Sequence, residues 1–130
     1  MNLRLKTNID VETKLSEIQN ALQLSSKAAV MRIAIAYSLR MTGDPREEEG
    51  EIKKYDIKKQ NGADYNRFTI FGSDEVVYKA MMQEHYNAII EDDLFFPEMT
   101  NAHISRGIKE LYADYKMSKN KEALVKKILS

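Results

Sequence analysis

The stretch Lys27–Leu39, KAAVMRIAIAYSL, decides the fold that the sequence predicts. It is apolar almost all the way round a helix, and such helices are usually central to a fold or pressed against a partner chain. Its alanines allow neighbouring helices to approach closely. Ser25 or Ser26 is expected to cap the start of this helix, and Gly43 and Pro45 stop the chain from continuing it. We therefore predict a helical protein built around this segment.

A short strand and an amphipathic helix are predicted before this segment. In residues 3–6, leucines alternate with Arg4 and Lys6, which is the two-residue period of a strand with one wet face. Asp10 is a suitable N-cap for the helix that follows. The apolar residues of that helix recur at spacings of four, three and four, so they form one stripe. They are Val11, Leu15, Ile18 and Leu22.

Residues 46–72 are predicted to form a charged loop and a small β-hairpin. The acidic run Arg46–Glu51 is interpreted as a solvated loop, and the basic run Ile52–Lys59 follows it directly. Asn61 and Gly62 indicate a turn. The aromatic and β-branched segment Phe68–Phe71 is expected to pair with the basic run.

The remaining residues, 73–130, are predicted to be helical. A third helix is expected over Glu75–Ile90, Pro97 suits the first turn of a fourth, and Ser118 or Asn120 begins the last. The inner stripe of the third helix is assigned to Val77, Met81, Ala88 and Ile89, and that of the fourth to Ile104, Ile108, Leu111 and Tyr115.

The predicted fold class is mainly α, with four to five helices, a short N-terminal strand and a small hairpin. We expect one domain over residues 1–130, composed of a strand–helix–helix unit (1–42), the charged loop and hairpin (46–72) and the C-terminal helices (73–130). The N-terminal half has the element order of a ribbon-helix-helix protein.

The composition excludes several kinds of chemistry. The chain has no cysteine, which excludes disulfides, thiolate metal sites, iron–sulfur clusters and a cysteine nucleophile. Its five scattered glycines form no phosphate-binding loop, and His85 and His103 lack the spacing of zinc and di-iron motifs. We therefore expect no catalytic residues, no cofactor and no metal. Since no signal-peptide pattern or bilayer-spanning run is present, we expect a cytoplasmic protein without membrane association.

Charge patterning leaves nucleic acid as a candidate partner. Twenty basic residues balance twenty acidic ones, so the chain lacks the global positive field of many nucleic-acid-binding proteins. Binding would need charge gathered on one face or summed across subunits, although a lysine run is more often simply solvated. The predicted nucleic-acid-binding residues are Arg4, Lys6, Lys53, Lys54, Lys58 and Lys59.

Two further arginines, Arg32 and Arg106, lie within apolar helices. An unpaired buried charge is costly, so we expect them to pair with buried carboxylates rather than with phosphate.

Three stretches resemble one known family in their order and spacing. The first is Arg4–Leu39, which contains MRIAIAYSL, and the second is Phe68–Asp74, FTIFGSD. The third, Ala102–Ile108, AHISRGI, is similar to a His-x-x-Arg-Gly signature. The chain resembles the DndE family, the small subunit of the bacterial DNA sulfur-modification (phosphorothioation) system. The charged region Glu47–Asn66 and the tail after Tyr115 depart from it.

The resemblance implies a helical subunit that self-associates, with a tetramer favoured, and that binds double-stranded DNA with a preference for nicked duplex. It implies a place beside a cysteine desulfurase and the other sulfur-modification subunits, which hold the iron–sulfur and ATP-dependent chemistry. The expected function is a non-catalytic, DNA-binding accessory subunit acting through a basic face.

Two other readings stay open. A ribbon-helix-helix repressor would project Arg4 and Lys6 from an intertwined ribbon into the major groove of a specific operator, but the long C-terminal helical region is surplus to that fold. In a purely structural adaptor the lysines would only be solvated.

Overall fold

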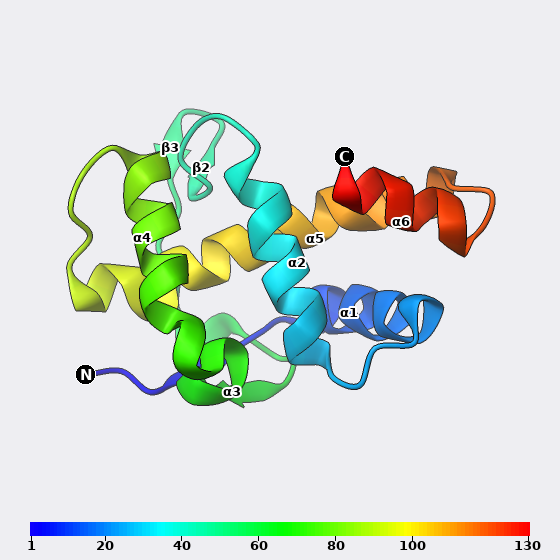
Figure 1. Cartoon of the computed structure of the whole chain (residues 1–130). Helices are drawn as coiled ribbons and strands as arrows, with labels where there is room; N and C mark the ends of the chain where they lie inside the picture. The colour runs from blue at the N-terminus through cyan, green and yellow to red at the C-terminus, as the bar shows by residue number, and fades with distance from the viewer.

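Helix α2 (Lys27–Leu39) is the central element of the computed structural model, which describes all 130 residues. The side chain of Ser26 accepts a hydrogen bond from the backbone N–H of Ala29 at 3.2 Å, which confirms one of its two predicted caps. Helix α2 crosses α5 (Thr100–Met117) and also contacts α1 (Ile9–Leu22) (Figure 1). The apolar surface of α2 is therefore covered largely within the chain.

The other elements complete a mainly helical fold and confirm the predicted fold class. Strand β1 (Arg4–Lys6) pairs antiparallel with β4 (Asp64–Asn66), and β2 (Glu47–Glu48) pairs with β3 (Glu51–Ile52) as a hairpin. The remaining helices are α3 (Arg67–Phe71), α4 (Glu75–Tyr86) and α6 (Lys121–Leu129), and the short helical turns are η1 (Ile57–Lys59), η2 (Gly72–Asp74) and η3 (Leu94–Met99). No helix has the length and apolar character needed to cross a lipid bilayer.

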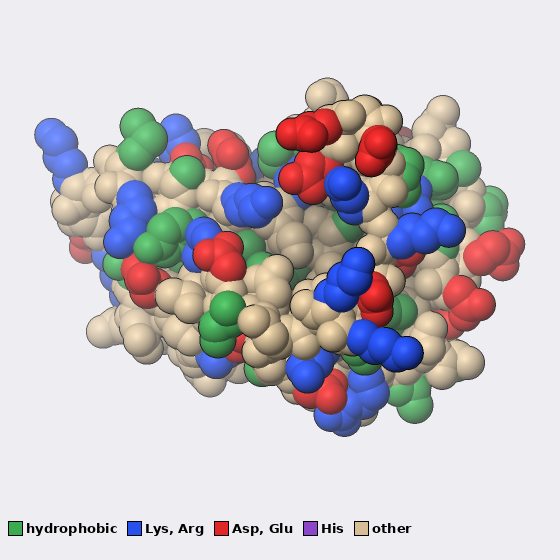
Figure 2. Space-filling model, turned by 180° about the vertical axis from the view of Figure 1, so that it is seen from behind, with side chains coloured by type: hydrophobic (Ala, Val, Ile, Leu, Met, Phe, Trp, Pro, Cys, Tyr) green, Lys and Arg blue, Asp and Glu red, His purple; other side chains and the backbone are tan.

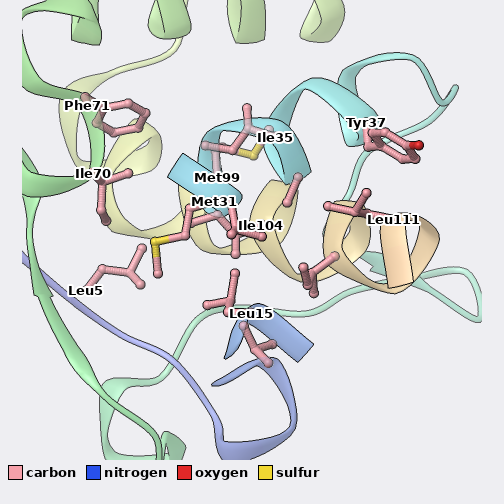
Figure 3. Packing of buried hydrophobic residues seen from close by; sticks show 14 of the residues in the cluster. Leu5, Leu15, Met31, Ile35, Tyr37, Ile70, Phe71, Met99, Ile104 and Leu111 are labelled. Atoms are coloured by element: carbon pink, nitrogen blue, oxygen red, sulfur yellow. The ribbon is translucent and has the colours of Figure 1, made fainter. Parts of the chain in front are cut away.

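The buried apolar side chains form one cluster at the junction of β1 and the first, second, third and fifth helices (Figure 3). The predicted stripes of the first and fourth helices are confirmed, because their members are buried or packed against this cluster. Its labelled members are Leu5, Leu15, Met31, Ile35, Tyr37, Ile70, Phe71, Met99, Ile104 and Leu111.

Gly107 sets the distance between α2 and α5. A Cβ atom at this position would lie 1.6 Å from the carbonyl oxygen of Ala34, far inside van der Waals contact. Only glycine therefore permits this helix crossing.

The predicted hairpin between the basic run and Phe68–Phe71 is wrong. The side chain of Asn66 accepts a hydrogen bond from the N–H of Phe68 at 2.8 Å and so starts helix α3, which contains this segment. Ile70 and Phe71 then enter the core, and their packing outweighs the β-propensity of the segment.

The predicted cap of α1 also differs. Asn8, rather than Asp10, occupies the N-cap, and its Oδ1 accepts from the N–H of Val11 at 2.8 Å. Asp10 lies in the first turn, where its carboxylate pairs with Lys14 at 2.6 Å.

The buried face of helix α4 differs from the predicted one. It ends at Tyr86, because Asn87 adopts a left-handed backbone conformation with φ of 61°. Met82 is fully buried, whereas Val77 and Met81 are 55% and 40% exposed. The helix carries apolar residues on both faces, so periodicity alone could not select the buried one; Ala88 and Ile89, beyond the helix, are exposed as well.

Candidate nucleic-acid interface

A tyrosine fixes the basic run beside strand β1. The hydroxyl of Tyr55 accepts a hydrogen bond from the N–H of Lys6 at 2.9 Å and donates one to the carbonyl oxygen of Lys6 at 3.1 Å. Burial raises the pKa of this tyrosine, so the hydroxyl stays protonated. The structure thereby brings together the two groups of predicted nucleic-acid-binding residues, which are separated by almost fifty positions in the sequence.

The cations of these groups are largely unpaired. Arg4 contacts Asp64 at 3.1 Å, and Lys53 approaches Glu51 at 3.7 Å, with both partners exposed in each pair. Such exposed pairs contribute little to stability, so a phosphate can replace the carboxylate at small cost. The other four cations, Lys6, Lys54, Lys58 and Lys59, form no salt bridge.

A cleft of about 310 Å³ lies between the β2–β3 hairpin and one face of α5. Its hairpin wall includes Lys53, Lys54 and Tyr55, and its α5 wall includes Arg106 and Lys109. In Figure 2 acidic side chains gather on the hairpin, in the upper part of the view, and basic side chains lie beside and below it. The structure therefore adds α5 to the two predicted basic groups.

One arginine in the wall of this cleft holds the hairpin in place. Arg46 is 11% exposed and binds Asp44 through two nitrogens, at 3.1 and 2.8 Å, and Glu98 at 3.1 Å. The guanidinium keeps the pKa of the Asp44 carboxyl below its usual range. These ion pairs neutralise Arg46 and tie the start of the hairpin to η3.

The expected carboxylate partners of Arg106 and Arg32 are absent, and backbone carbonyls take their place. Arg106 donates to the carbonyl oxygens of Ser38, Thr42 and Gly43, at 2.7, 3.1 and 3.0 Å. Arg32 donates to the carbonyl oxygen of Ile70 at 2.7 Å. The last carbonyls of a helix have no partner within the helix, so both arginines satisfy acceptors at or just beyond the ends of α2 and α3.

A comparison with protein families identifies the family of this chain. The family model described as DNA sulphur modification protein DndE matches residues 4–119, which is most of the chain. The chain belongs to the DndE family. The match confirms the resemblance noted in the sequence, and helix α6 lies beyond the matched range. No curated protein matches the sequence.

The packing of α2 against α5 brings together two of the stretches that carry the resemblance to the family. Buried His103 contacts the hydroxyl of Ser38 at 2.8 Å through Nδ1, and Nε of Arg106 donates to the same hydroxyl at 2.8 Å. Gly107 supplies the close contact with Ala34. The two stretches 31–39 and 102–108 are therefore one packing unit.

The two histidines contact each other and other groups of the chain. Burial lowers the pKa of His103 to about 3, so its ring is neutral at physiological pH. Nε2 of His85 contacts the carbonyl oxygen of Met41 at 2.7 Å, and the two rings lie edge to face with centroids 5.4 Å apart. No group of three or more metal-ligating side chains gathers anywhere in this DndE family member.

Sequence reasoning missed Lys109 and the structural role of Tyr55. Lys109 belongs to no lysine run, and nothing in the local sequence shows that residues 53–55 pack opposite it. Tyr55 lies between lysines, which was the available signal, but its bonds to Lys6 depend on tertiary structure.

Proposed function

We propose that this chain is a non-catalytic accessory subunit of the DNA sulfur-modification system that binds duplex DNA, nicked duplex included, through one basic face. Family membership supports the role in DNA sulfur modification. The observation that carries the binding mode is the Tyr55 contact with Lys6, which gathers the cations on one side of the molecule. The proposed role on DNA implies a cytoplasmic protein that works beside the other sulfur-modification subunits. The basic face consists of Arg4, Lys6, Lys53, Lys54, Lys58 and Lys59.

The basic face explains how an electroneutral protein can attract DNA. Each lysine or arginine that meets a phosphate releases condensed counterions, which gives affinity without sequence preference. The hairpin carries three exposed carboxylates at one side of the basic face, and these would repel the phosphate backbone of DNA. They are Glu47, Glu48 and Glu51. Attraction and repulsion together would orient the duplex along β1 and η1.

Replacing Lys53, Lys54, Lys58 and Lys59 with alanine is expected to lower the salt dependence of DNA binding. Four lost phosphate contacts correspond to a decrease of roughly 3 to 4 units in the slope of log K against log salt concentration. The measurement is a titration of intact, nicked and single-stranded oligonucleotides over a salt series.

The matched control replaces the four exposed lysines of the C-terminal region, Lys119, Lys121, Lys126 and Lys127, and so removes the same charge. Its slope should stay near that of the unmodified protein. Equal slopes for both variants would show that total charge, rather than the basic face, governs binding.

We also propose that copies of the chain associate through the outer face of α4. Val76, Val77 and Met81 are 78%, 55% and 40% exposed there, and Ala80 between them leaves room for a second helix. Exposed apolar faces of this kind usually mark interaction sites. Association of two or more copies would also sum their basic faces, as an electroneutral protomer needs for tight DNA binding.

Val77→Asp is expected to shift the molecular mass in solution toward that of the monomer, because it places a carboxylate in the apolar contact. Light scattering after gel filtration measures this. Ala113→Asp, at an exposed position of α5, serves as the control and should leave the mass unchanged. A monomeric unmodified protein would refute self-association, and an unchanged mass for Val77→Asp would assign it to another surface.

A ribbon-helix-helix repressor is less compatible with this structure. Strand β1 is bonded to β4 of the same chain on one edge, and Tyr55 occupies backbone groups of Lys6 on the other. One edge is therefore paired and the other is partly occupied, which disfavours an intertwined ribbon with a second copy. Binding that survives a large excess of unrelated DNA would nevertheless favour the repressor, since nonspecific binding should be competed away.

A further inference from the structure

We propose that the cleft between the β2–β3 hairpin and α5 binds a phosphate group, supplied by the backbone of a nucleic-acid strand. This inference rests on the proposed function, because it names the part of DNA that the cleft takes. It adds residues of α5 to the basic face.

Three cations without a carboxylate partner line the same cleft. Lys54 and Lys109 are exposed and form no salt bridge, and Arg106 is bound only to neutral acceptors. By contrast Arg46, in the same wall, is neutralised by two carboxylates. The cleft as a whole is lined by five cationic side chains and three carboxylates, so it keeps a net positive charge and attracts an anion.

The three cations would have different roles. The guanidinium nitrogens of Arg106 already donate to four acceptors on or beyond the end of α2, so this residue contributes charge and positions the loop that leads to the hairpin. The ammonium groups of Lys54 and Lys109 have free donors and would contact the phosphate oxygens directly.

Neutral donors are available on the same wall of the cleft. Asn101 and Ser105 precede Lys109 at intervals of four residues, so the three side chains share one face of α5. The side chains of Asn101 and Ser105 are partly buried and make no hydrogen bond within the chain. An amide and a hydroxyl beside two ammonium groups form a donor set suited to phosphate oxygens.

The carboxylates of the cleft do not form a competing cation site. Glu98 is occupied by Arg46, and the neighbours Glu47 and Glu48 lie on a strand, where successive side chains point to opposite faces. The volume of about 310 Å³ is at the lower end for small-ligand pockets. The cleft can hold one phosphate with its attached sugar, while the rest of the duplex would lie across the basic face outside the cleft.

The test uses the full chain, the variant Lys54→Ala/Lys109→Ala and the matched control Lys126→Ala/Lys127→Ala. Inorganic phosphate is titrated while backbone amide resonances are followed by NMR. In the unmodified protein and the control, shift changes should concentrate in residues 45–48, 53–55 and 98–109. In the cleft variant, phosphate affinity should fall about tenfold or more, as expected for two lost charge-assisted contacts. All four lysines are exposed, so thermal melting should be unchanged.

The same proteins are then titrated with duplex and single-stranded DNA over a salt series. If the phosphate belongs to a DNA backbone, the cleft variant should lose roughly two units of salt slope and the control none.

Phosphate binding in the cleft with an unchanged DNA slope would identify a free phosphate compound as the occupant. Phosphate binding without any DNA binding would refute the proposed function and leave the cleft site standing. Shift changes outside the cleft, or equal phosphate affinities for both variants, would overturn the inference.

Discussion

Gly107→Ala is expected to destabilise the protein by about 3 kcal/mol or more, at the upper end for overpacked cores. The added methyl group would lie 1.6 Å from the carbonyl oxygen of Ala34, and backbone atoms cannot turn aside as a flexible side chain does. Helices α2 and α5 would have to separate along the packing unit that also contains Ser38 and His103. Urea unfolding followed by circular dichroism measures the effect.

The sign of this change makes it a sharp test. In an exposed helix interior, glycine to alanine stabilises by about 1 kcal/mol. Ala113→Gly, at an exposed position of the same helix, is the control and should cost about that amount. A Gly107→Ala variant that is as stable as the unmodified protein would mean that the two helices are not held at this distance in solution.

Arg67→Met is expected to cost about 2 to 3 kcal/mol, which is less than for a fully buried pair because its carboxylate partners are about one-third exposed. Arg67 is 6% exposed and binds Glu75 at 2.6 Å and Asp92 at 2.7 Å. Methionine keeps much of the apolar stem but leaves both carboxylates without their cation.

This ion pair also predicts a pH dependence. Hydrogen bonding to Arg67 lowers the pKa of Asp92, so its contribution is present above the unfolded pKa of about 4 and is lost as the pH falls further. Unfolding measured from neutral pH down to about 2 should show a shallower acid loss in Arg67→Met than in the unmodified protein. Arg4→Met, which breaks the exposed pair with Asp64, should cost less than about 1 kcal/mol. If both variants lost the same free energy of unfolding, the burial of Arg67 would not set the strength of its ion pairs.

The features that the sequence predicts well depend on neighbouring residues. The apolar character of Lys27–Leu39 places α2 at the centre, and the stripe at Ile104, Ile108 and Leu111 identifies the inner face of α5. Asn120 caps α6 as one of the two predicted positions, with its side chain accepting from Ala123 at 2.9 Å. In each case hydrophobic period or local hydrogen bonding carries the information.

The features that it misses depend on residues far apart in the chain. Phe68–Phe71 has the composition of a strand. It forms a helix because this conformation buries both Ile70 and Phe71 in the core. The sequence predicts that Arg106 pairs with a carboxylate. In the fold it reaches the free carbonyl oxygens just beyond α2 instead. The same limit applies to the candidate site, since residues 53–55 and 105–109 meet only after folding.

The contacts at the two ends of the segment between Thr42 and Gly62 bear on how the family can diversify. Arg106 clamps one end, and at the other the N–H of Gly62 donates to the carbonyl oxygen of Thr7 at 2.7 Å. Between these clamps the segment contributes almost nothing to the buried core. The segment is therefore a surface insertion whose two ends are held by the rest of the fold. Inside it, Arg46 and Tyr55 tie the segment to Glu98 and Lys6. Changes of length or charge that keep these contacts would therefore alter what the surface binds while leaving the core intact.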